Sequence, residues 1–469
     1  MTQQKKHALS VFSLMMMNIA LIASLRGLPT MAEEGLSIVF FLLFAAVVFL
    51  IPVALVSAEL ATAWPKEGGI YVWIKEAFGE RWGFAIVWME WLQNMVFYPT
   101  ALSATAGILA YGFSPTLAEN PLYILVVVIS VYWGATFINL KGLKWSSLFT
   151  NIGVFAGLVI PGAVLIASGF YWVLGGHSLA IPITFQNFMP NLSNMDNLVF
   201  LTGVFLFFAG MEVSAVHAQE VKNPKKDYPK AILMSSIVIV ALFILGALTI
   251  ALIIPRAEIS LTAGIMEVFA EIFGDLGMKW IVPILGFLVS IGLVASIIAW
   301  IAGPSKGVLV AAKHGDLPPL FRKTNKNHMQ TTVLIIQGIV VSCISLIFLF
   351  MPDVSSSFWI LTALAAQLYL SVYIIMFIAA IALKYKKPDV ERPYSVPGGK
   401  IGMIIIAGIG LSASLFAIIL GFLPPSQLPT GSLFFYEAFL VIGLFGVIVV
   451  PHIIYKFRKE SWKHPDLRK

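Results

Sequence analysis

The stretch Leu198-Val-Phe-Leu-Thr-Gly-Val-Phe-Leu-Phe-Phe-Ala-Gly-Met-Glu-Val-Ser-Ala-Val-His-Ala-Gln-Glu220 begins as an almost unbroken apolar run. Such a run is typical of a helix that crosses a membrane. Near its middle, Gly210 weakens the helix and Glu212 adds a carboxylate. A carboxylate at the centre of a membrane helix costs about 2.5–3.5 kcal/mol on insertion scales. A weak point and an acid at this depth indicate a binding site rather than an anchor.

The composition is that of a membrane protein. Of the 469 residues, 59% are hydrophobic and only 11% are charged, and the mean hydropathy is +0.92. A soluble domain carries about 25% charged residues, so we predict an all-α polytopic membrane protein without a soluble domain. The single cysteine, Cys343, cannot form an intrachain disulfide. The sequence has no phosphate loop, zinc-protease motif or nucleophile elbow, so we expect no ATP motor, no enzyme, no cofactor and no metal site.

About twelve membrane spans follow from the rule that some 20 apolar residues cross a bilayer. We predict them at 8–31, 36–62, 83–112, 121–139, 147–172, 197–218, 229–254, 279–311, 331–351, 356–384, 401–422 and 433–456. Of the 30 lysines and arginines, only Arg256 and Lys279 fall in outer loops, and Arg26 lies within a span. The others lie on one side, which the positive-inside rule makes the cytoplasm. Both termini are therefore expected to be cytoplasmic, and the basic tail suits lipid headgroups rather than nucleic acid.

The first predicted span contains its own interruption, Asn18-Ile-Ala-Leu-Ile-Ala-Ser-Leu-Arg-Gly-Leu-Pro29. Pro29 lacks an N–H and disturbs the turn before it, and Arg26 is an obligate cation. Spans 1 and 6 are thus both interrupted by glycine and a charge, five spans apart. This pattern predicts an inverted repeat of 8–172 against 197–384, followed by two spans at 401–456, with short cytoplasmic ends at 1–7 and 457–469. The simpler alternative is a kink in each span without a ligand.

The chemistry of two facing breaks is specific. Unwound backbone leaves N–H and C=O groups that lipid cannot satisfy. Half-helix N-termini suit a carboxylate, and half-helix C-termini and free carbonyls suit an ammonium. A zwitterionic amino acid supplies both charges, so the backbone alone predicts amino-acid-like substrates.

Several motifs resemble those of the amino acid–polyamine–organocation permeases. They are Pro65-Lys-Glu-Gly-Gly-Ile-Tyr71 with Gly79-Glu-Arg-Trp-Gly83 after span 2, Phe208-Ala-Gly-Met-Glu-Val-Ser214 in span 6, and Glu220-Val-Lys-Asn-Pro-Lys-Lys-Asp-Tyr-Pro-Lys-Ala231 before span 7. Three more resemble the bacterial glutamate:γ-aminobutyrate antiporter branch: Trp300-Ile-Ala-Gly-Pro-Ser-Lys-Gly307, Pro397-Gly-Gly399 and Phe422-Leu-Pro-Pro425. The resemblance covers about residues 5–460.

The resemblance implies the leucine-transporter fold with helices 1 and 6 broken, and alternating-access transport of amino acids across the inner membrane of a bacterium. It implies that the substrate contacts Ile22, Ala23, Ser24 and Leu25 at the span-1 break, Phe207, Phe208 and Gly210 at the span-6 break, Trp300 in span 8, and the pair Tyr369 and Tyr373 in span 10. It assigns gating and proton sensing to Glu212. The implied partners are a small-molecule amino acid and membrane lipids, and a homodimer is left open.

Two departures from that branch leave the substrate open. Ser296 stands where the branch has an acidic residue four positions before Trp300, and the chain ends fourteen residues after Tyr455, too soon for the C-terminal plug of that branch. An amino acid antiporter for acidic or neutral substrates is the leading hypothesis. A proton-coupled symporter and an exchanger of basic amino acids or polyamines are the alternatives.

Single residues also have competing interpretations. Arg26 could hold the distal carboxylate of an acidic substrate, pair with Glu212, Glu33 or Glu34, or reach out of the membrane. Glu212 could titrate as a gate or be a carboxylate held by backbone donors. For His217, a helix-end polar role is favoured over a proton relay. A polar patch in span 3 is expected to make interhelical hydrogen bonds rather than substrate contacts; it consists of Glu90, Gln93, Asn94 and Tyr98.

Overall fold

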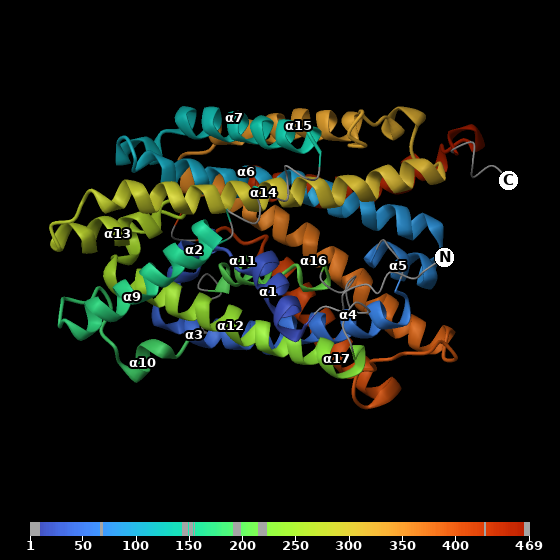
Figure 1. Cartoon of the computed structure of the whole chain (residues 1–469), viewed down its shortest axis with the longest axis horizontal. Helices are drawn as coiled ribbons and strands as arrows, with labels where there is room; N and C mark the ends of the chain where they lie inside the picture. Colours follow the sequence, from blue (N-terminus) through green and yellow to red (C-terminus); the bar gives the residue numbers. More distant parts are fainter. Residues whose placement is uncertain are drawn as a thin grey trace.

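The computed structural model describes residues 10–65, 69–142, 149, 153, 155–190, 198–213, 223–425 and 428–463. Over these ranges the chain is a bundle of helices with no β-strand (Figure 1). Nine helical segments there are long and apolar enough to cross a membrane: Gly35–Ala63, Pro121–Leu140, Phe155–Leu174, Lys225–Ile253, Ile281–His314, Thr331–Leu349, Val354–Lys386, Gly399–Leu420 and Leu433–Lys456. The predicted all-α polytopic fold class is confirmed.

Most of these segments are single helices, and three are composite. The single helices are α7 (Pro121–Leu140), α12 (Pro224–Ile253), α14 (Ile281–His314), α16 (Val354–Lys386), α17 (Gly399–Leu420) and α18 (Leu433–Lys456). The composite segments are η2 (Gly35–Ser37), α3 (Ile38–Ala45), π-helical η3 (Ala46–Leu50) and α4 (Ile51–Ala63); π-helical η5 (Phe155–Val159) and α9 (Ile160–Leu174); and α15 (Thr331–Ser345) and η10 (Leu346–Leu349).

The first predicted span is broken where the sequence indicates. Helix α1 (Val11–Ile22) ends, and Ala23 and Ser24 adopt extended backbone conformations with ψ angles of 123° and 133°. The chain resumes as the 3-10 turn η1 (Leu25–Gly27) and the short helix α2 (Leu28–Ala32). Pro29 lies in the first turn of α2, where the missing N–H has no partner to lose. The proline therefore helps to begin α2 and does not cause the break.

The sixth predicted span is broken as well. Helix α11 (Leu201–Phe207) is followed by a turn at 208–210 and a 3-10 turn at 211–213. Gly210 has a φ of 113°, a conformation that costs other residues dearly. The two predicted breaks are confirmed. The division into repeats at 8–172 and 197–384 stays a prediction.

The third predicted span is one unbroken helix, α6 (Glu80–Ala110), of 31 residues. It is less apolar than the nine segments because Glu90, Gln93 and Asn94 lie in its middle. The loops contain the four-residue helix α10 (Phe185–Phe188) and two longer helices that were not predicted either, α5 (Ile70–Phe78) and α13 (Gly264–Asp275). Both bury one apolar face against the bundle, and neither is long enough to span a membrane.

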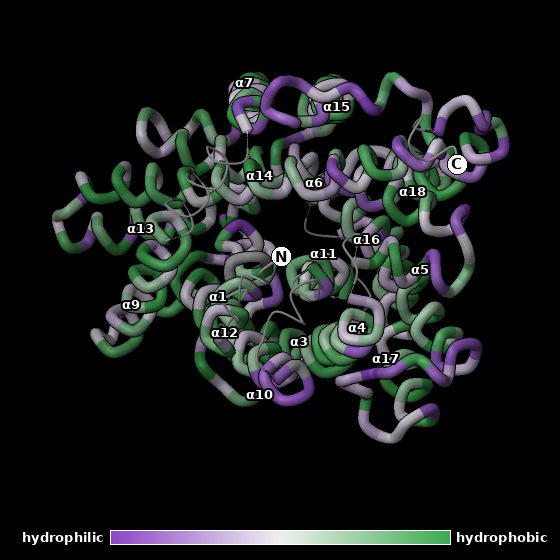
Figure 2. Tube along the Cα trace, turned by 45° about the vertical axis from the view of Figure 1, so that its right-hand side comes forward, coloured by the Kyte–Doolittle hydropathy of each residue, from purple (hydrophilic) through white to green (hydrophobic). Residues whose placement is uncertain are grey.

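Helices α1 and α11 lie near the middle of the bundle in two views (Figures 1 and 2). Helix α6 packs along α14 and α16, α1 packs along α12, and α7 and α15 lie side by side at one edge. On α18, Phe434 and Ile442 are 82% and 72% exposed. An apolar outer face of this kind suits contact with lipid tails.

A buried ion cluster joins α4, α16 and the segment that follows α16. Lys384 donates hydrogen bonds to both oxygens of Glu59, at 2.7 and 2.9 Å, and Arg392 Nε lies 3.0 Å from Glu59 Oε1. The backbone N–H of Val396 adds a bond of 2.7 Å to the same carboxylate. The side chain of Glu59 is 2% exposed, so this one carboxylate compensates two cations out of contact with water.

A second ionic contact joins the last described segment to the end of α14. Arg458 Nη1 lies 3.3 Å from Asp316 Oδ1 and 3.7 Å from Glu80 Oε2. Burial raises the pKa of Asp316 to about 6, and the attraction of Arg458 opposes this shift. Beside this contact, a Cβ atom on Gly315 would lie 2.7 Å from the side chain of Lys463, so the terminal segment packs tightly there.

Candidate functional site

The two broken helices meet at Gly27 and Phe207. A Cβ atom on Gly27 would lie 2.7 Å from the Phe207 ring. Only glycine allows this approach without a shift of the ring or of the backbone. The breaks in α1–α2 and in α11 thus face the same interior space.

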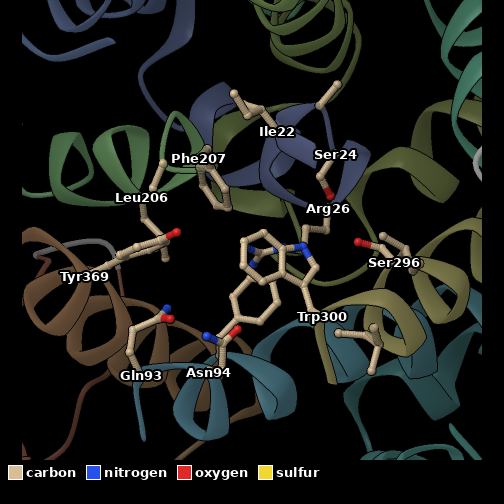
Figure 3. Close-up of a pocket in the computed structure, with 16 residues that line it drawn as sticks. Ile22, Ser24, Arg26, Gln93, Asn94, Leu206, Phe207, Ser296, Trp300 and Tyr369 are labelled. Atoms are coloured by element: carbon tan, nitrogen blue, oxygen red, sulfur yellow. The ribbon is translucent and has the colours of Figure 1, made fainter. Parts of the chain in front are cut away.

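That space is a cavity between α1, α6, α11, α14 and α16 (Figure 3). Its lining consists of Ile22, Ala23, Ser24, Arg26, Gln93, Asn94, Phe97, Ala101, Leu206, Phe207, Ala209, Leu293, Ser296, Ile297, Trp300 and Tyr369. Seven of the predicted site residues belong to it: Ile22, Ala23, Ser24, Arg26, Phe207, Trp300 and Tyr369. The structure therefore brings together predicted residues from four separate spans.

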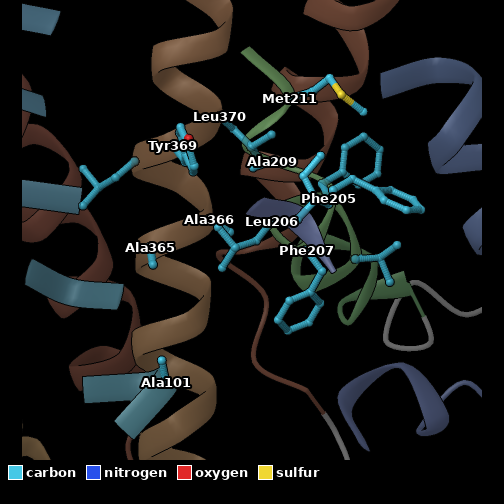
Figure 4. Close-up of a cluster of buried hydrophobic side chains, with 14 of the residues drawn as sticks. Ala101, Phe205, Leu206, Phe207, Ala209, Met211, Ala365, Ala366, Tyr369 and Leu370 are labelled. Atoms are coloured by element: carbon cyan, nitrogen blue, oxygen red, sulfur yellow. The ribbon is translucent and has the colours of Figure 1, made fainter. Parts of the chain in front are cut away.

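Four other predicted substrate-binding residues, and Glu212, lie outside the lining. Leu25 is 1% exposed, and its side chain points towards Gly162 on α9. Phe208 packs against Phe243 on α12, with ring centroids 5.7 Å apart. Gly210 and Tyr373 do not line the cavity. The backbone N–H of Gly210 donates a hydrogen bond to the Tyr373 hydroxyl, which in turn donates one to Glu212. Figure 4 shows the apolar packing of this turn against α16.

Glu212 is held by two tyrosines of α16. The Tyr369 hydroxyl donates a hydrogen bond of 2.6 Å to Glu212 Oε1, and the Tyr373 hydroxyl donates one to Oε2. The Tyr373 hydroxyl also accepts a bond of 2.8 Å from the backbone N–H of Gly210. The two rings stack with centroids 5.1 Å apart, as expected for residues four apart on one helical face. Both oxygens of this carboxylate, which is 4% exposed, are therefore bonded.

Arg26 is a buried cation at the cavity wall. It is 5% exposed, and its guanidinium carbon lies 4.4 Å from the centre of the Phe97 ring and 4.9 Å from that of Phe207. Its Nη1 has no hydrogen-bond partner. In Figure 3 Arg26 lies beside Trp300 at the cavity. Such burial excludes the interpretation in which Arg26 reaches out of the membrane.

The carboxylates considered as internal partners of Arg26 are engaged elsewhere or unpaired. Glu212 is bonded to the tyrosines, and Glu33 lies 3.4 Å from Arg256. Burial raises the pKa of Glu33 to about 7 against the attraction of Arg256. Glu34 Oε1 has no partner. In the described part of the chain, no acidic side chain forms an ion pair with Arg26.

Helix α6 contributes residues that the sequence did not single out as substrate-facing. Gln93, Asn94, Phe97 and Ala101 all line the cavity. Of the span-3 patch, Tyr98 makes the expected interhelical bond, since its hydroxyl donates a bond of 3.0 Å to the carbonyl of Trp300, whereas the Asn94 amide donates to the carbonyl of Glu90 in its own helix. The spacing of positions 94, 97 and 101 marks one helical face, and this is the signal that could have found it.

Some expectations fall outside the described residues: His217, the sequence between Ser214 and Lys222, and the Lys66–Gly68 part of the span-2 signature. Among the residues that the structure does describe, no group of three or more potential ligands could hold a metal ion.

Comparison with known proteins identifies the family. A model described as "Amino acid permease" matches residues 9–445. An uncharacterized transporter of Legionella pneumophila is 41% identical over 458 residues, which cover 97% of this chain and 98% of that protein. A glutamate/gamma-aminobutyrate antiporter of Lactococcus lactis is 32% identical over 97% of this chain and 92% of its own length. A probable agmatine/putrescine antiporter of the same species is 28% identical over 84% of this chain and 83% of its own length.

The family model runs through both broken helices and through the stretches of α6, α14 and α16 that line the cavity. These matches agree with the resemblance inferred from the sequence motifs. With the family model covering most of its length, the chain belongs to the amino acid permease family.

Proposed function

We propose that the protein is a secondary active amino acid antiporter that works by alternating access, with acidic or neutral amino acids as substrates. The observation that carries this proposal is Arg26, a buried cation at the cavity without an acidic partner in the described structure. An uncompensated buried charge is strongly unfavourable. The distal carboxylate of a substrate such as glutamate would compensate it.

The two breaks would bind the common part of an amino acid. No side chain caps η1, so the N–H groups that open this turn are available to a substrate carboxylate at Ser24 and Leu25. The C-terminal end of α11, at Phe207 to Gly210, would bind the ammonium. In this arrangement the side chain of the bound amino acid extends towards Arg26, Ser296 and Trp300. Leu25, Phe208 and Gly210 would act through their backbone, because their side chains lie outside the lining or are absent.

Relatives support exchange as the mode of transport, since two of them are named as antiporters. Proton-coupled symport is the alternative within the same fold. Exchange of basic amino acids or polyamines is disfavoured, because Arg26 would repel a cationic side chain. We further propose that the protein lies in the inner membrane of a bacterium with both termini cytoplasmic, as the basic residues indicate. A homodimer stays an open prediction.

The test uses purified protein in proteoliposomes. Uptake of labelled glutamate should require internal amino acid, whereas a symporter would respond to a proton gradient in empty vesicles. Arg26→Gln should reduce glutamate uptake by at least about tenfold, the effect of losing one charge-assisted contact of roughly 1.5–3 kcal/mol. Uptake of neutral amino acids should fall less. An equal loss for acidic and neutral substrates would show that Arg26 does not select the side chain.

A further inference from the structure

Glu90 continues the cavity-facing stripe of α6. Asn94, Phe97 and Ala101 line the cavity at helical spacing. Glu90 lies one turn earlier on the same face, about 6 Å along the axis from Asn94. Since α6 begins at Glu80, this carboxylate lies between the cavity and the end of the bundle that is predicted to face the cytoplasm.

The packing of α14 shows what lies opposite Glu90. A Cβ on Gly307 would meet Val87, and a Cβ on Gly286 would meet the carbonyl of Ile108, so α6 and α14 run antiparallel. This register places Glu90 level with Pro304, next to Gly303. Gly303 continues the face of α14 that carries Trp300, and no atom lies within 4 Å of its Cβ position. Glu90 itself is partly accessible although protein surrounds it, so it borders interior space.

The carboxylate of Glu90 has no stabilising partner in the described structure. No described side chain donates a hydrogen bond to it or pairs with it; its backbone carbonyl alone accepts a bond, of 2.8 Å, from Asn94. It interacts electrostatically with Glu212 and with Tyr369. Tyr373 is engaged with Glu212, and Lys306, the charged residue of α14 nearest to this level, is exposed.

The two carboxylates therefore differ in one decisive respect. Glu212 has both oxygens bonded by tyrosine hydroxyls, which stabilise its ionised form. Glu90 has no such donors, and a second negative charge beside Glu212 in a medium of low dielectric is unfavourable. A proton on Glu90 removes that charge, and within the described residues no basic side chain pairs with Glu90 to compensate it.

We propose that Glu90 is a proton-binding site on the path between the cavity and the cytoplasmic end. The carboxylate takes one proton from the solution when the path is open at that end. It holds the proton while the path is closed and returns it to the same side, so no net proton crosses the membrane. The inference rests on the proposed transport function for the direction of the path, but proton binding itself can be measured without transport.

Infrared spectroscopy of the full-length protein tests proton binding directly. The wild type should show a protonated-carboxyl absorption band at neutral pH that falls by the share of one carboxyl in Glu90→Gln, while Glu33, whose pKa burial raises to about 7, continues to contribute. Glu271→Gln, which changes an exposed glutamate of α13, is the matched control and should keep the band. A band of unchanged intensity in Glu90→Gln would overturn the proposal, whether or not the protein transports amino acids.

Exchange in proteoliposomes tests the consequence. Wild-type exchange should rise as the pH on the cytoplasmic side falls, by up to about tenfold per pH unit, the limit for one titrating group. Glu90→Gln mimics the protonated form and should stay at the acid-side rate at every pH, with unchanged glutamate binding. Retention of the wild-type profile, or loss of exchange with binding intact, would contradict the proposal. Glu90→Asp keeps the carboxyl, so its exchange should again depend on pH. If Glu90→Gln does not fold, Glu90→Asp serves as the test. A pH profile of Glu90→Asp identical to that of the wild type would contradict the proposal.

Discussion

The hydroxyl of Tyr369 donates a hydrogen bond of 2.6 Å to Glu212 and so joins α16 to the turn that follows α11. Tyr369 also lines the cavity. One side chain therefore contacts both the space proposed for the substrate and the carboxylate proposed as a gate. Removal of the Tyr369 hydroxyl should therefore affect transport more than folding.

Tyr369→Phe should lower exchange by about 10- to 100-fold, because a hydrogen bond to a charged group contributes roughly 1.5–3 kcal/mol. The thermal midpoint should change little, since the ring and its stacking on Tyr373 remain.

Glu212→Gln should shift the pH profile of exchange, whereas Glu90→Gln should flatten it. Intact transport with the wild-type profile in Glu212→Gln would exclude a gating role for this residue.

Gly27→Ala tests the contact between the two broken helices. The added methyl would lie 2.7 Å from the Phe207 ring, and overpacking of this kind costs about 1–3 kcal/mol. Exchange should be lost or strongly reduced, and Phe207→Leu in the same chain should restore part of it. The control is Gly134→Ala on α7, where no atom lies within 4 Å of the new methyl. If both alanines behave alike in a transport assay, the close approach is not required.

Glu59→Gln tests the buried ion cluster. Loss of one partner of a buried pair costs about 3–5 kcal/mol, and here it would leave Lys384 and Arg392 without their counter-charge. Denaturant or thermal unfolding in detergent measures this loss. The matched control, Glu76→Gln, removes the partner of the more exposed Lys387 and should cost no more than about 1 kcal/mol. Equal stability of the two variants would show that the cluster contributes little.

The contact between Asp316 and Arg458 should depend on pH. The pair needs the ionised carboxyl, which predominates above the pKa of about 6, so its attraction is lost as the pH falls through 6. Burial of the Asp316 charge has the opposite effect on stability. Because the pKa of Asp316 in the folded protein lies above the ordinary value of 3.8, protonation of this carboxyl favours the folded state. This contribution is fully present below pH 3.8 and is lost as the pH rises through 6.

Hydrogen exchange of residues 457–463 measures the contact locally. After correction for intrinsic rates, protection should be higher at pH 8 than at pH 5. Asp316→Asn should show low protection at both values, because it cannot form the ion pair. Protection in the wild type that does not change between the two pH values would contradict the prediction.

The breaks in the first and sixth spans could be predicted because their cause is local. A glycine and a charge inside an apolar run weaken a helix whatever surrounds it. The break at Ala23 and Ser24 and the turn at Gly210 confirm this reasoning. The role of Pro29 was less clear from the sequence, since the same residue can end one helix or begin the next.

The partners of the charged side chains could not be predicted, because they depend on contacts between distant segments. Arg26 had several acidic residues in reach by sequence, and packing places two aromatic rings beside it instead. The pairing of Glu59 with Lys384 joins positions 325 residues apart. Similarly, the rotation of α6 decides that Asn94 faces the cavity, and this rotation depends on how α6 packs against α14 and α16.

The position of Arg26 between the Phe97 and Phe207 rings has a consequence for the unloaded protein. Two aromatic faces offer a buried cation about 2 kcal/mol or more each, which is much less than water or a carboxylate provides. An acidic substrate bound as proposed would compensate the charge, which the empty form leaves uncompensated. The empty form is then the least favourable state in which to change its access from one side to the other. Net transport in one direction without a counter-substrate should therefore be slow. Inward and outward flux would be tightly coupled without any further structural element that blocks the empty protein from changing its access.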